Sequence, residues 1–252
     1  MLGVFLGPEW FFKRVPRAYT DTEREQIVAL VERLSVKYPK LLIIPGSIIW
    51  RKAGSGPHGR FRKKAEMGNL APVVFNGRCI HRVEKEINAG DTAGYALADE
   101  KDSDINTKVK STREYLRHSA KLTDNTSFFK IENVKFSLEI CGDHSSGKRA
   151  ANELAQRPPF PGHGRADVQL LVAHGAGFVK PGSGQTVREG GVAYSVDAAP
   201  VGNSKNAFGT VTTATNTKKT TSSPETSTTI LENVDKEKSF GLSTRDMGMW
   251  DL

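Results

Sequence analysis

The chain has 252 residues, of which 37% are hydrophobic and 25% charged, with a formal net charge of +8 at pH 7. This composition is typical of one globular domain with a sizeable core, and no apolar run reaches the roughly 18 residues that a membrane-spanning helix needs. Two cysteines are too few for a disulfide framework, and no signal peptide is visible at the N-terminus, so we expect a reducing, cytoplasmic compartment.

Much of the positive charge lies in one stretch, residues 51–64, with the sequence RKAGSGPHGRFRKK. Its glycines and its proline break regular structure, which predicts a basic loop that is solvated or shields a substrate. No recognised nucleic-acid motif accompanies the loop, so we do not expect nucleic acid as a partner.

The N-terminal part alternates between strand and helix patterns. Val4–Gly7 is a short apolar strand that leads to Glu9. Residues 20–37 predict a helix, because Thr20 and Glu23 form a capping box and Ile27, Leu30, Val31 and Leu34 form an apolar stripe. Residues 41–44 are continuously apolar, as in a strand buried on both faces, and the helix-to-strand crossover favours a partly parallel sheet.

Two hairpins are predicted further along the chain. Residues 72–83 turn at Asn76-Gly77 and lead to Lys85, and residues 128–140 turn at Glu132-Asn133. In the last strand of the second hairpin, apolar residues alternate with Lys135, Ser137 and Glu139, which predicts one apolar face. A helix over residues 148–156 and strands over 168–173 and 191–196 complete the pattern, with His174 at the end of the first of these strands.

Cys141 stands at the end of the second hairpin and is followed by Gly142. A thiol at a strand end, with the next backbone N–H available to an oxyanion, is typical of a nucleophile. Two other interpretations stay open from these residues alone. The thiol is an inert core cysteine, or residues 142–149, GDHSSGKR, bind a nucleoside triphosphate as an imperfect P-loop in which Arg149 replaces the required hydroxyl.

Three short motifs resemble, in order, the catalytic motifs of the nitrilase (carbon–nitrogen hydrolase) superfamily. They are PEWFF at residues 8–12, VEKEINAGD at 83–91 and LEICGDH at 138–144. The resemblance implies an α/β fold, a four-layer αββα sandwich, with a triad of Glu9, Lys85 and Cys141 and with Gly142 at the oxyanion. That family normally has a strand and a helix before the glutamate, so we expect these first elements to be missing. Asp91 is a further acidic candidate.

The resemblance also implies an activity. In the implied reaction, Cys141 attacks the carbon of a non-peptide carbon–nitrogen bond and forms a thioester. This reaction needs no metal and no organic cofactor. By this resemblance we expect the substrate to be a small amide or nitrile, with amides favoured, and the chain to form a homodimer or a higher homo-oligomer. The alternatives are a catalytically impaired, nitrilase-like binding module and the nucleotide-binding protein described above.

The C-terminal part has a different composition. Of the residues from 210 to 229, 13 of 20 are Ser or Thr, with no periodicity. Such a segment buries too little apolar surface to offset the entropy cost of ordering. We therefore expect a hydrolase domain over residues 1–209, a disordered linker over 210–230 and a C-terminal tail over 231–252.

Overall fold

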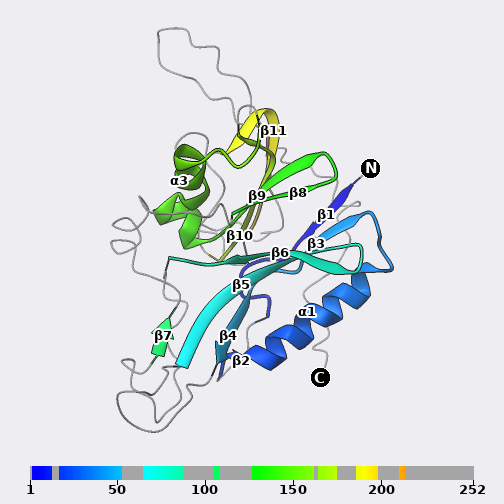
Figure 1. Ribbon diagram of the computed structural model, residues 1–252, viewed down its shortest axis with the longest axis vertical. Helices are drawn as coiled ribbons and strands as arrows, with labels where there is room; N and C mark the ends of the chain where they lie inside the picture. Colours follow the sequence, from blue (N-terminus) through cyan, green and yellow to red (C-terminus); the bar gives the residue numbers. More distant parts are fainter. Residues whose placement is uncertain are drawn as a thin grey trace.

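The computed structural model describes residues 2–12, 17–52, 65–87, 105–107, 127–161, 164–174, 186–197 and 210–213. Within these ranges it is a mixed α/β structure with two sheets and two α-helices (Figure 1). Neither helix is long and apolar enough to cross a membrane. The predicted tail, Asp91 and most of the basic loop lie outside the described residues.

The first sheet has seven strands, and its main path runs in the order β1-β3-β5-β4-β2, with β6 and β7 paired to β5. β1 and β3 are parallel and are connected through the helix α1 (Asp21–Ser35), which confirms the predicted crossover. The strands are β1 (Gly3–Leu6), β2 (Tyr19–Thr20), β3 (Leu41–Ile44), β4 (Ile48–Lys52), β5 (Ala65–Phe75), β6 (Arg78–Glu84) and β7 (Ile105–Thr107).

The second sheet has five strands in the order β12-β11-β10-β9-β8. Its three central strands are parallel, so their C-terminal ends lie at one edge of the sheet. The strands are β8 (Phe128–Ile131), β9 (Val134–Ile140), β10 (Ala166–Ala173), β11 (Val187–Asp197) and β12 (Thr210–Thr213). β12 consists of the first four residues of the predicted linker and pairs with β11, and the rest of that linker lies outside the described residues.

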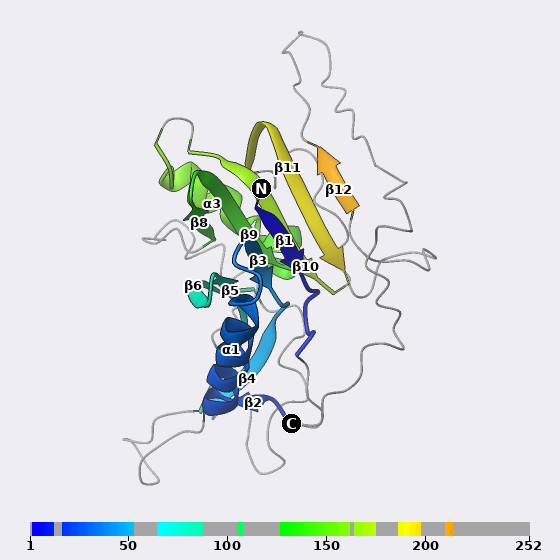
Figure 2. The ribbon, with the colours of Figure 1, turned by 90° about the vertical axis from the view of Figure 1, so that its right-hand side faces the viewer.

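The two sheets pack face to face through one apolar core. In this core, residues of β3, β5 and β6 meet residues of β8, β9 and β10. In Figure 2, β1 and β3 lie close to β9 and β10. Phe136, Leu138 and Ile140 form the apolar face that was predicted for β9. The opposite face of β9 is also buried, with Ser137 and Glu139 at 0% exposure, so the alternating pattern marks a polar buried face rather than a solvated one.

Helix α1 (Asp21–Ser35) covers the outer face of the first sheet, and the predicted capping box of Thr20 and Glu23 is present. The predicted apolar stripe is partly wrong. Ile27 and Val31 are buried, but Leu30 and Leu34 are 43% and 47% exposed. The buried face also includes Val28 and Ser35, so it is rotated around the helix axis, away from the two leucines.

Both predicted hairpins are confirmed. Asn76 and Gly77 have φ values of 48° and 79°, the left-handed pair that a type I′ turn requires. In the second hairpin Glu132 takes the left-handed conformation, with φ 52°. The first hairpin is longer than expected, because β5 already begins at Ala65. The predicted helix after Cys141 is α3 (Arg149–Gln156), which packs on the second sheet.

Candidate active site

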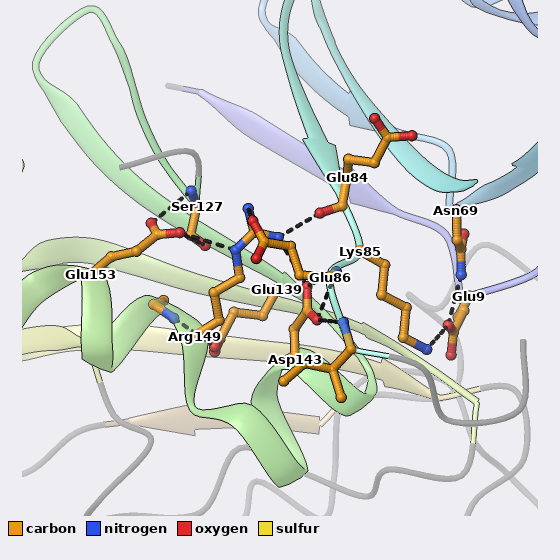
Figure 3. A network of polar contacts seen from close by, with 12 residues as sticks. Glu9, Asn69, Glu84, Lys85, Glu86, Ser127, Glu139, Asp143, Arg149 and Glu153 are labelled. Atoms are coloured by element: carbon orange, nitrogen blue, oxygen red, sulfur yellow. Dashed lines mark hydrogen bonds and ion pairs between the residues drawn. The ribbon is translucent and has the colours of Figure 1, made fainter. Parts of the chain in front are cut away.

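Glu9 is held at the junction of the two sheets. It directly follows the loop after β1, and its backbone N–H donates to Ala173 O at the end of β10 (3.3 Å). Its carboxylate oxygen Oε1 accepts from Lys85 Nζ at 2.7 Å and from Asn69 Nδ2 at 3.0 Å. Only 1% of Glu9 is exposed. The carboxylate is therefore buried, and the donors of Lys85 and Asn69 hold it in place (Figure 3).

Lys85 is fully buried although it lies in the charged run RVEKE. The alternation of β6 continues past its end, because Val83, Lys85 and Ile87 are buried while Glu84 and Glu86 are only partly so. The backbone N–H of Lys85 donates to Asn69 O at 2.8 Å. The side chains of Lys85 and Glu9 both have 0% exposure, so they form an ion pair shielded from water.

Cys141 forms a sharp turn at the end of β9. Its φ is 44°, a left-handed conformation that costs a non-glycine residue energy. Its N–H donates to Val172 O (2.9 Å), and its carbonyl accepts from the N–H groups of His144 (3.0 Å) and Ser145 (3.1 Å). The thiol lies 3.7 Å from His174 O, and the residue is 6% exposed. These contacts fix the direction of the thiol at the strand end.

The surroundings of Cys141 keep its thiol protonated. The pKa of this thiol is raised to about 12, mainly by burial and also by charge repulsion from the Glu9 carboxylate, and the Lys85 ammonium opposes both effects. A neutral thiol needs a base before it can attack, and the neighbouring carboxylate is a group that can take the proton.

The structure thus brings Glu9, Lys85 and Cys141 together from three regions far apart in the sequence. Gly142 follows Cys141 at the start of the turn and is buried with it. His174 also reaches this region, where its ring contacts the ring of Trp10 at 4.4 Å between centroids. Cys79 and Cys141 are both free, so no disulfide consumes the thiol.

Sequence reasoning missed Asn69, although a signal was present. Asn69 is the one amide residue in the apolar stretch NLAPVVF, and a buried polar side chain within a strand requires a partner. Its side chain binds Glu9 and its backbone carbonyl binds Lys85, so a single residue of β5 contacts both charged members of the cluster.

The turn after Cys141 differs from a phosphate-binding loop. Asp143 is fully buried within it, and burial raises the pKa of this carboxyl to about 6 against the opposing effect of Arg149. Lys148 is exposed, and Arg149 is 1% exposed and paired with carboxylates. A carboxylate inside the loop repels phosphate, so the nucleotide-binding alternative gains no support from this arrangement. Among the described residues, no group of three or more His, Cys, Asp or Glu residues is arranged to hold a metal ion.

Comparisons with known proteins give a distant structural likeness. No protein-family model matches the chain, and no curated protein matches it. Among solved structures, the chain is similar to the glutamine-dependent NAD+ synthetase from Acinetobacter baumannii, determined in complex with adenosine diphosphate. The sequence identity is 15% and the TM-score 0.41. The match covers 84% of this chain but only 35% of that one, so the chain spans about a third of the length of this neighbour.

Proposed function

We propose that the protein is a hydrolase of non-peptide carbon–nitrogen bonds, of the amidase type, with Cys141 as nucleophile. The observation that carries this proposal is the buried Glu9–Lys85 ion pair beside a buried thiol at a strand end. Burying two charges costs several kcal/mol per ion before pairing, and such a cost is often found where chemistry requires the charges. The order α1, first sheet, second sheet, α3 supports the further proposal of an αββα sandwich within a hydrolase domain of residues 1–209.

The proposed reaction has two halves. Glu9 takes the proton of the thiol while the Cys141 sulfur forms a bond to the substrate's carbonyl carbon. The Lys85 ammonium and the Gly142 N–H stabilise the resulting oxyanion. When the tetrahedral intermediate collapses, the carbon–nitrogen bond breaks and Glu9 returns the proton to the leaving ammonia or amine. Glu9 then activates a water molecule, which converts the thioester to the acid and releases the thiol.

The test is ammonia release from a library of small amides and nitriles, together with intact-mass detection of a covalent acyl adduct. We expect turnover and an adduct with wild type, neither with Cys141→Ala, and both with Cys79→Ser, which changes the other cysteine and is the matched control. An adduct that persists in Cys141→Ala would refute the nucleophile.

A catalytically impaired binding module is the second candidate, and the 6% exposure of Cys141 is the observation that favours it. A binding module would show a thermal shift with small amides but no ammonia release and no adduct. The homo-oligomeric state remains a prediction from the sequence, and sedimentation of the purified chain tests it.

A further inference from the structure

Lys85 requires support from outside its own strand. β6 ends at Glu84, so Lys85 follows the last residue of the strand, and its backbone is tied to the first sheet by the hydrogen bond to Asn69 O. A long ammonium side chain has many rotamers, and its effect on a neighbouring oxyanion depends on where its backbone is fixed.

Asp143 holds the chain just after Lys85. Its Oδ1 accepts from the backbone N–H of Glu86 (3.0 Å) and from that of Ile87 (2.8 Å). Asp143 is fully buried and lies only two residues after Cys141. One carboxylate therefore joins the turn that carries the thiol to the segment that carries the ammonium (Figure 3).

Arg149 holds the chain just before Lys85. Its Nη1 donates to the backbone carbonyl of Glu84 and to Asp143 Oδ2 (3.0 Å), and its Nη2 lies 3.2 Å from Glu86 Oε1. The guanidinium is in turn held on α3 by Glu153, whose Oε1 accepts from Nε at 3.0 Å. The ion pair of Asp143 and Arg149 thus contacts residues on both sides of Lys85 (Figure 3).

We propose that the Asp143–Arg149 pair is a positioning device that fixes the Lys85 ammonium relative to the Cys141 sulfur. The hydrogen bonds of the pair reach the backbone on either side of Lys85, so the pair acts on the position of the ammonium through that backbone, beside the charge attraction between Asp143 and Lys85. This inference rests on the proposed function, because it assigns the pair to the same cysteine chemistry.

A purely structural role explains the pair less well. Replacing a buried ion pair by apolar residues of similar volume is often neutral for stability, so such pairs are weak evidence of a stabilising role. The backbone groups that this pair binds belong to residues 84, 86 and 87, on either side of Lys85. These bonds fix the position of residues 84–87 relative to the turn that follows Cys141.

The test compares Asp143→Asn with Glu139→Gln. Both replace a fully buried carboxylate by its amide, and both lie two residues from Cys141. Glu139 accepts from His144 Nδ1, Gln169 Nε2 and the N–H of Ala150, and none of these belongs to the Lys85 segment. It is therefore the matched control for a general loss of buried charge near the thiol.

The first readout needs no substrate. Lys85 lowers the pKa of the Cys141 thiol, so a displaced ammonium leaves less thiolate at a fixed pH. We expect iodoacetamide to alkylate Cys141 about threefold to tenfold more slowly in Asp143→Asn, and at the wild-type rate in Glu139→Gln. Equal rates in wild type and Asp143→Asn, or equal slowing in both variants, would overturn the proposal.

The second readout is turnover of an amide that wild type accepts. We expect kcat to fall about 10²-fold in Asp143→Asn with KM nearly unchanged, because the oxyanion interaction exists only in the transition state. A rise in KM alone would overturn the proposal. If wild type turns over no amide, the proposed function fails, while the alkylation comparison still decides whether the pair positions Lys85.

Discussion

Glu9→Gln should make Cys141 react faster with an alkylating reagent and hydrolyse an amide more slowly. In the protein, burial and the Glu9 charge raise the thiol pKa from 9.0 to about 12, while Lys85 lowers it. Glutamine keeps the shape of the side chain and the burial but removes the negative charge. The Lys85 ammonium is then no longer neutralised by a partner 2.7 Å away, so its attraction for a thiolate increases. The same substitution therefore lowers the pKa of the thiol and removes the general base.

The size of the effect follows from the pKa. A rise of three units lowers the thiolate fraction about a thousandfold. If the substitution reverses about one to two of these units, the thiolate fraction rises about 10-fold to 100-fold. A less basic thiolate is also a weaker nucleophile, by about half of that gain on a logarithmic scale, so alkylation should accelerate about 3-fold to 10-fold. Hydrolysis should slow about 10²-fold to 10⁴-fold, because the general base is missing.

The assay is the second-order rate constant for iodoacetamide, followed by intact mass between about pH 7 and pH 10, in a Cys79→Ser background so that one thiol reacts. Ammonia release from an accepted amide is measured on the same preparations. Slower alkylation in Glu9→Gln than in the parent protein would refute the argument that Glu9 suppresses the thiolate. Near-native hydrolysis would refute its role as the base.

Three further outcomes are expected. Lys85→Met leaves the Glu9 carboxylate buried without its ammonium and should lower the free energy of unfolding by about 3–5 kcal/mol in urea titrations, with a smaller loss in the double variant that also carries Glu9→Gln. Thr20→Ala removes the oxygen that accepts from the Glu23 N–H (3.1 Å) and should cost about 1 kcal/mol, seen as a lower thermal midpoint, whereas Thr20→Ser should not. The raised pKa of Asp143, about 6 against 3.8, means that its protonation favours folding: its contribution to stability is complete below about pH 4 and is lost as the pH rises through 6. Turnover should change in the other direction, because the carboxylate is the form that pairs with arginine, and an acid limb near pH 6 should be absent from the profile of Asp143→Asn.

Local features of the fold could be predicted from the sequence because they depend on neighbouring residues. The capping box at Thr20 and the left-handed pair at Asn76-Gly77 are both decided within four residues, and both are present. The exposure of Leu30 could not be predicted, because it depends on how α1 is rotated against a sheet assembled from distant strands. The helical period predicts the spacing of the apolar residues in α1, but it does not predict which of them pack against the sheet.

The candidate site divides in the same way. Glu9, Lys85 and Cys141 could be predicted as candidates because each belongs to a short motif, but burial of the lysine could not be derived from a run as charged as RVEKE. Its burial depends on Asn69, which lies 16 residues earlier and accepts its N–H, and on Asp143, which lies 58 residues later.

Asp143 leaves no periodic pattern in the sequence, because it binds the backbone N–H groups of Glu86 and Ile87, and every residue except proline has such a group. This is why the supporting residues of the cluster emerge only when β5, β6 and the turn after β9 are seen together. It is also why a substitution at Asp143 is more informative than one at Lys85. Removing the lysine deletes the ammonium itself and destabilises its partner, whereas changing Asp143 keeps the ammonium in the protein and removes a carboxylate that holds the neighbouring backbone.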